Sequence, residues 1–79
     1  MKPGDMIGIR TYAENLYENR HVPGTTGSPP IGIMEKGETG ILLEVARDDQ
    51  GTDVYRILTC KGAIGWISPF GSWSVRVLG

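Results

Sequence analysis

The sequence has little of what an enzyme or a metalloprotein needs. Its 79 residues include one cysteine, Cys60, and one histidine, His21. One cysteine forms no internal disulfide, and together with one histidine it falls short of the four ligands of a structural zinc site. No nucleophile and orienting acid stand at a recognisable spacing from His21. We therefore predict that the chain is not an enzyme and that it has no catalytic residue, metal or cofactor.

An excess of charge of one sign and long apolar runs are also lacking. Eight Lys and Arg residues stand against nine Asp and Glu residues, which gives a net charge of −1. Binding to nucleic-acid phosphates depends on excess positive charge, so this balance argues against such a partner. No run free of charge is long enough to cross a bilayer, and the N-terminus lacks the apolar stretch of a signal peptide. These absences predict a cytoplasmic protein without membrane contact.

Glycine and proline, in contrast, are abundant. Twelve Gly and five Pro exceed the roughly nine or ten of the two together that a chain of this length has on average. They predict one small domain over residues 1–79 with many turns and no helical bundle. Pro23, Pro29 and Pro30 exclude a helix or a central strand at residues 21–30. We expect an ordered loop there, and one short helical turn at residues 14–19 before it.

Alternating apolar residues predict five strands, at residues 6–12, 39–47, 53–60, 64–68 and 73–78. In the second strand, Ile41, Leu43 and Val45 share one face at period two. Gly51 is suited to the hairpin turn that follows, because glycine adopts positive φ at no steric cost. Short strands with one long early loop predict an all-β, five-stranded small barrel, with a long Gly/Pro-rich loop between strands one and two. Closure of the barrel would remove exposed sheet edges.

This order of strands resembles the Src-homology-3-like barrel. Within that superfold, residues 38–78 are similar to the small barrel proteins of tailed bacteriophages. Their second half commonly reads G-h-h-x-x-V, where h is hydrophobic, and then Y-x-V-h-W-x-D-G-x-x-G-W. The matching segments here are Gly40-Ile41-Leu42-Leu43-Glu44-Val45, Tyr55-Arg56-Ile57-Leu58 and Gly62-Ala63-Ile64-Gly65-Trp66. Thr59 stands where that family commonly has Trp, and Lys61 where it commonly has Asp. The resemblance implies a virion component, such as a capsid-decoration or tail-associated protein.

A second, weaker resemblance implies another class. Residues 36–45 are similar to the K-G-x-x-G-x-V-x-x-V core of the KOW motif, found in ribosomal and transcription factors. That motif implies an RNA- or ribosome-associated module. Here Glu35, Glu38 and Glu44 interleave with Lys36, so the local field lacks the positive sign that phosphate binding needs. The KOW-like module remains the alternative.

Aromatic residues and the proline-containing loop are the best candidates for a binding site. The barrel would bring the aromatic residues to one end, where such clusters line grooves for extended peptides. The loop is semi-rigid and suits contact with a neighbouring subunit at small entropic cost. We predict partner contacts at Tyr12, Tyr17, Thr25, Thr26, Pro29, Pro30, Phe70 and Trp73. Two alternatives stay open: in the first, Trp66 and Trp73 fill the core, and in the second, the loop is a plain surface loop.

These features together predict a non-enzymatic protein-interaction module. We expect a structural or accessory subunit of a larger assembly, such as a phage virion, acting through a protein partner or through self-assembly. The chain would then be an oligomer or part of a complex. Its location would be the cytoplasm, or the virion if a phage encodes it.

Overall fold

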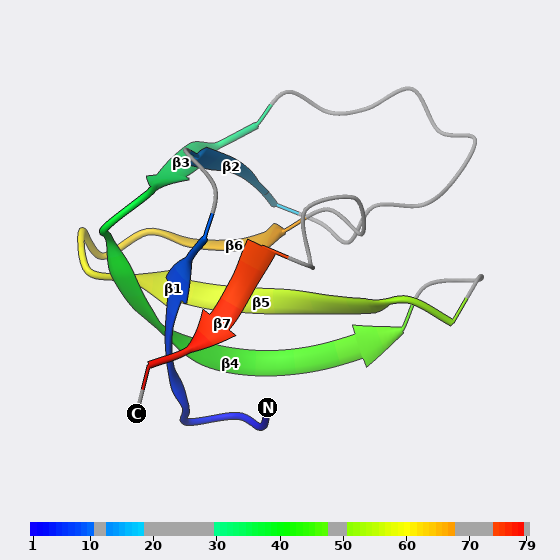
Figure 1. Ribbon diagram of the computed structural model, residues 1–79. Helices are drawn as coiled ribbons and strands as arrows, with labels where there is room; N and C mark the ends of the chain where they lie inside the picture. Colours follow the sequence, from blue (N-terminus) through cyan, green and yellow to red (C-terminus); the bar gives the residue numbers. More distant parts are fainter. Residues whose placement is uncertain (11–12, 19–29, 48–50, 68–73, 79) are drawn as a thin grey trace.

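The chain forms one curled antiparallel β-sheet (Figure 1). The computed structural model describes residues 1–10, 13–18, 30–47, 51–67 and 74–78. These residues contain seven strands, β1 (Met6–Ile9), β2 (Ala13–Tyr17), β3 (Gly32–Glu35), β4 (Thr39–Arg47), β5 (Asp53–Thr59), β6 (Ile64–Ile67) and β7 (Val75–Val77). Their order in the sheet is β3-β2-β6-β5-β4-β1-β7. β3 and β7 are the two edge strands, and they do not pair with each other within the described residues. The sheet is therefore a half-barrel.

The all-β prediction is confirmed, and the sequence locates the second half of the chain well. β4 has the predicted bounds, and β5 and β6 each end one residue before the prediction. Arg47 pairs with Asp53 across the β4–β5 hairpin, as the turn prediction requires. Gly51 has a φ of 79°, the positive value that the turn demands of glycine. A turn glycine and alternating apolar residues are therefore sufficient to identify this hairpin.

The prediction of five strands is wrong, because the described residues also contain β2 and β3. β2 replaces the helical turn predicted at residues 14–19, which is likewise wrong. Ala, Glu and Asn have low strand propensity, and Leu16 is the one fully buried side chain of β2. Pairing with β3 and β6 on its two sides thus determines this strand, rather than the local preference of its residues.

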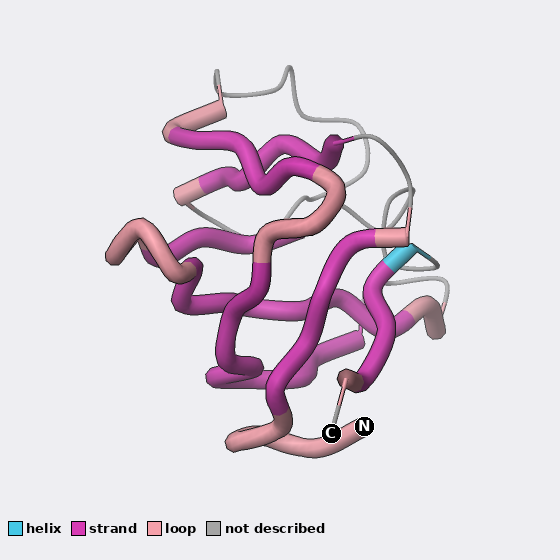
Figure 2. Tube along the Cα trace, turned by 60° about the vertical axis from the view of Figure 1, so that its left-hand side comes forward, coloured by secondary structure: helices cyan, strands magenta, loops and turns pink. Residues whose placement is uncertain are grey.

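The strands curl around one inner face (Figure 2). One core cluster of buried side chains lies on that face, and every strand contributes to it. Its buried members are Ile7, Ile9, Leu16, Met34, Leu42, Ile57, Ile67 and Val75, with Val45 and Tyr55 packed against them. The radius of gyration is 11.4 Å, close to the value of about 11.6 Å expected for a folded domain of this length. The curl of the sheet allows a single sheet to enclose a core.

A β-bulge in β4 changes which side chains face that core. The pairing of β4 with β5 shifts between Leu42 and Glu44, which leaves Leu43 as the extra residue. A bulge of this kind bends the strand and interrupts its alternation. Leu42 is completely buried, whereas Leu43 is 36% exposed. The prediction that Ile41, Leu43 and Val45 share one face is therefore wrong, because period two does not continue across the extra residue.

Two glycines allow strands to approach closely on the inner face. A Cβ atom on Gly40 would lie 2.8 Å from both Cγ2 of Ile57 and the carbonyl oxygen of Leu58. On Gly65 it would lie 2.8 Å from Cβ of Leu16. Any larger residue would therefore push the strands apart. The structure thus gives each of these two glycines a packing role.

Candidate functional site

The outer face of the sheet, opposite the core, carries a row of aromatic and charged residues. Residues paired across antiparallel strands point to the same side of a sheet. Tyr17 pairs with Trp66, and Trp66 pairs with Arg56. Arg56 in turn pairs with Glu44. These four residues form a line across β2, β6, β5 and β4, which we call the aromatic–charged row.

A second line of residues, the apolar row, crosses four strands beside the first. Met6 of β1 pairs with Ile41 of β4, which pairs with Leu58 of β5. Leu58 pairs with Ile64 of β6. The two outer members remain largely open to solvent, with Met6 49% and Ile64 45% exposed. Ile41 and Leu58 are half-buried. The row places apolar surface in water, outside the core cluster.

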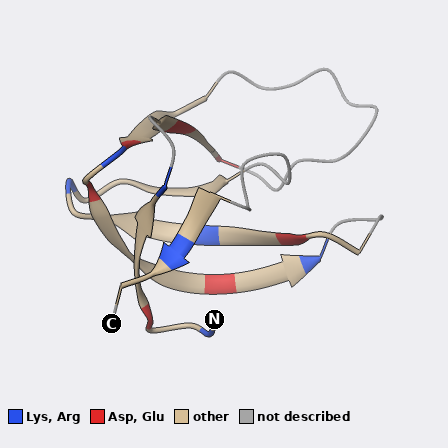
Figure 3. Cartoon of the chain, viewed as in Figure 1, with Lys and Arg blue, Asp and Glu red and all other residues tan. Residues whose placement is uncertain are grey.

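The charges of the outer face are balanced rather than of one sign. Nη1 of Arg56 lies 4.0 Å from Oε1 of Glu44, and both side chains are about half exposed. Exposed pairs of this kind contribute little to stability. Figure 3 shows basic and acidic positions alternating along β4 and β5 instead of gathering in one region. The Arg56 and Glu44 charges are thus accessible to a partner.

These residue types are typical of binding surfaces. Trp, Tyr and Arg are the types most enriched in the energetic centres of protein interfaces, where apolar side chains surround them. The two rows together hold one carboxylate, one guanidinium and one phenol, and none of their members is a histidine, cysteine, serine or threonine. The arrangement offers flat apolar area beside one charge of each sign.

The two edges of the sheet, in contrast, each carry features that disfavour the addition of another strand. Open edges recruit extended segments, and proteins blunt them with charges, prolines or capping groups. Pro30 has no N–H group and directly precedes Ile31 and β3. At the other end of β3, the N–H of Glu35 donates to Oε1 of Glu38 at 2.9 Å. β7 is three residues long and carries exposed Arg76 at its centre.

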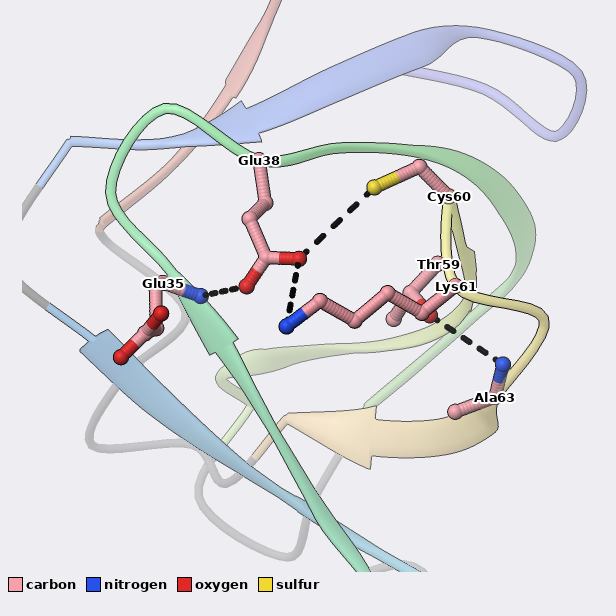
Figure 4. A network of polar contacts seen from close by, with 6 residues as sticks. All are labelled: Glu35, Glu38, Thr59, Cys60, Lys61 and Ala63. Carbon is pink, nitrogen blue, oxygen red and sulfur yellow. Dashed lines mark hydrogen bonds and ion pairs between the residues drawn. The ribbon is translucent and has the colours of Figure 1, made fainter.

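Glu38 is also the centre of a polar network that joins two turns (Figure 4). Its Oε2 atom accepts a hydrogen bond from Sγ of Cys60 at 3.7 Å and lies 3.4 Å from Nζ of Lys61. The N–H of Cys60 donates to the carbonyl oxygen of Thr39 at 3.0 Å. The hydrogen bond from Glu35, followed by the interaction with Lys61, holds the pKa of the Glu38 carboxyl below its ordinary value. The network ties the β3–β4 turn to the β5–β6 turn.

Within the described part of the chain, no three His, Cys, Asp or Glu side chains gather as metal ligands would. That described part also contains no helix that is long and apolar enough to span a membrane. The Glu38 network brings two carboxyl-bearing residues near one thiol, but the Glu35 side chain points away from Cys60 and Glu38 in Figure 4. We therefore interpret that network as structural.

Two of the predicted contact residues lie in the described part of the chain. Tyr17 is half-buried in the aromatic–charged row. Pro30 is exposed and lies at the same end of the β2–β3 hairpin, since the N–H of Ile31 donates to the carbonyl oxygen of Leu16. The other predicted residues lie outside the described residues, so their roles stay predictions; they are Tyr12, Thr25, Thr26, Pro29, Phe70 and Trp73.

The structure also places Trp66, for which the sequence leaves two interpretations open. Trp66 lies on the outer face, half-buried and outside the core cluster. The core interpretation of Trp66 is therefore wrong. The sequence alone does not show that Arg56, Glu44 and the apolar row belong to one surface, because these residues come from four different strands. The signal that could have found them is the outward position of alternate residues in each strand, combined with the pairing register.

We compared the chain with models of known protein families, with curated proteins and with solved structures, and none of the three comparisons finds a match.

Proposed function

We propose that this chain is a non-enzymatic protein-interaction module that binds its partner through the outer face of the sheet. The observation that carries the proposal is the pair of rows on that face, four strands wide. A domain this small has little apolar surface to spare, and the core cluster already lies on its inner face. Exposed Met6 and Ile64 beside Trp66 and Arg56 match the composition of protein interfaces.

The wider context of the proposal is a structural or accessory subunit of a larger assembly. The resemblance of residues 38–78 to the small Src-homology-3-like barrels of tailed phages supports a virion component. A subunit of this kind needs a stable small fold and a contact surface, and it needs no reactive group. The capped N–H of Glu35 at β3 and the short, charged β7 agree with assembly through a face, because such features disfavour uncontrolled growth of the sheet.

Co-purification from the organism that encodes the chain tests this proposal. The tagged chain is compared with Ile64→Lys, which places a charge in the apolar row. Val77→Lys is the matched control, since Val77 is 43% exposed, receives the same charge and lies on β7 outside both rows. We expect Ile64→Lys to lose the associated proteins and Val77→Lys to retain them.

Equal recovery of associated proteins with both variants would contradict the proposal. Recovery of RNA instead, lost on nuclease treatment and at raised salt, would favour the KOW-like alternative.

A further inference from the structure

We infer that the outer face binds a second copy of this chain, so that the module forms a twofold-symmetric dimer; this inference rests on the proposed function. The argument comes from the order of residues within the two rows. A twofold interface is self-complementary, because each residue that contacts a partner residue is itself contacted in the same way. A face qualifies when one rotation brings unlike charges together and apolar groups together.

The outer face meets this condition for one axis, which runs parallel to the strands and between β4 and β5. The rotation places β5 of one copy over β4 of the other. Arg56 then faces Glu44 of the second copy, and Glu44 faces its Arg56, because these two residues are paired neighbours in the register. The contact contains two Arg–Glu pairs between the copies, and no like charges of the rows face each other.

The same rotation matches the apolar row with itself. Leu58 lies over Ile41 of the second copy, since these residues are also paired across β5 and β4. Ile64 of β6 lies over Met6 of β1, because β6 and β1 are equally distant from the axis in the sheet order. The two most exposed members of the row, Met6 and Ile64, therefore cover each other.

The curvature of the sheet determines how strong this contact is. The outer side of a half-barrel is convex, so two copies touch mainly along β4, β5 and their immediate neighbours. The two rows comprise eight residues, whereas interfaces of standard size use about 20–30 residues on each side. We therefore expect a weak dimer that forms with a dissociation constant between roughly 10 µM and 1 mM. Such a contact becomes stable when an assembly holds many copies close together.

Charge exchange between two variants tests the dimer directly. Arg56→Glu and Glu44→Arg each place like charges opposite each other in a dimer of the variant alone. In a one-to-one mixture of the two variants, both contacts between the copies become unlike again. The pair within each chain stays like-charged, so only contact between chains can restore association. Arg76→Glu, at an exposed position of β7 outside the rows, is the control for the change in net charge.

The mass of each sample is measured by light scattering up to about 1 mM chain, with thermal melts to confirm folding. We expect the mass of the wild type and of Arg76→Glu to rise with concentration from the monomer mass toward twice that value. Each single variant should associate about tenfold or more weakly, and the mixture should recover dimer formation. A wild type that stays monomeric at the highest concentration would overturn the inference, as would a mixture that stays monomeric or an Arg56→Glu variant that dimerises fully.

The result also separates this inference from the proposed function. Suppose that the wild type is monomeric and that Ile64→Lys loses the associated proteins. This result overturns the dimer inference but not the proposed function, and the partner is then a different protein. If Ile64→Lys both dimerises like the wild type and retains its associated proteins, the result contradicts both, because Ile64 lies in the predicted contact.

Discussion

At the scale of single residues, Gly40 shows how closely β4 and β5 approach each other. A methyl group at this position would contact the backbone oxygen of Leu58, which cannot move without disturbing the ladder. We expect Gly40→Ala to reduce the free energy of unfolding by about 1–3 kcal/mol, the usual cost of overpacking a well-packed site. Urea unfolding of the purified chain measures the change.

Gly8→Ala is the matched control, because its Cβ would meet the end of the flexible, partly exposed Leu78 side chain at 3.1 Å. A cost for Gly40→Ala no larger than that for Gly8→Ala would contradict the close approach of β4 and β5.

The Glu38 carboxylate makes a prediction about pH at the same scale. Its pKa lies below the ordinary value of 4.5 in the folded chain. The unfolded chain therefore takes up a proton first as the pH falls, so the stabilisation is complete above about pH 4.5 and is lost below it, through the folded pKa. We expect Glu38→Gln to lower the melting temperature at pH 7, with a difference from wild type that shrinks as the pH falls toward 3.

Glu18→Gln, at an exposed position after β2, supplies the control for removal of one negative charge. A deficit for Glu38→Gln that stays constant from pH 7 to pH 3 would show that the charge of Glu38 does not stabilise the network.

At the scale of single elements, the bulge in β4 distinguishes two adjacent leucines. Leu42 is completely buried among the core residues, and Leu43 is the exposed extra residue. We expect Leu42→Ala to cost about 2–5 kcal/mol of unfolding free energy, and Leu43→Ala to change it by no more than about 0.5 kcal/mol. Chemical denaturation of the two variants in parallel decides the point. Equal losses would show that β4 has no bulge at this position.

The strands also show how far the sequence determines the fold. β4 and β5 are predictable because alternating apolar residues, a turn glycine and short spacing coincide in one hairpin. β2 is not predictable, because Ala13, Glu14 and Asn15 have little preference for strands. They form a strand only because β2 pairs with β3 and β6. The bulge at Leu43 escapes prediction for the opposite reason, since the local pattern continues smoothly while the register does not.

The candidate surface is less predictable than the fold. Tyr17 can be selected from the sequence as an aromatic residue near a turn. Arg56 and Glu44 cannot, because an exposed charge on a strand is ordinary until the register shows what lies beside it. The outer face becomes a site only when four strands align their outward residues, and that alignment depends on long-range pairing.

At the scale of the whole molecule, the two faces of the sheet carry different sets of side chains. The inner face holds the fold together, with a contribution from every strand. The outer face carries apolar residues that the core does not use. The proposed function depends on this division, in which the core cluster alone holds the fold together and the outer face is left for contact with a partner.

The double variant Met6→Lys/Ile64→Lys tests that claim most directly. Its free energy of unfolding in urea is compared with that of the wild type. Both are measured at a chain concentration of about 1 µM, where the weak dimer is dissociated. If the outer face is not needed for folding, two exposed substitutions should change this free energy by no more than about 1 kcal/mol in total. A loss of several kcal/mol would show that the apolar row belongs to the fold, and would contradict the assignment of the outer face as a contact surface.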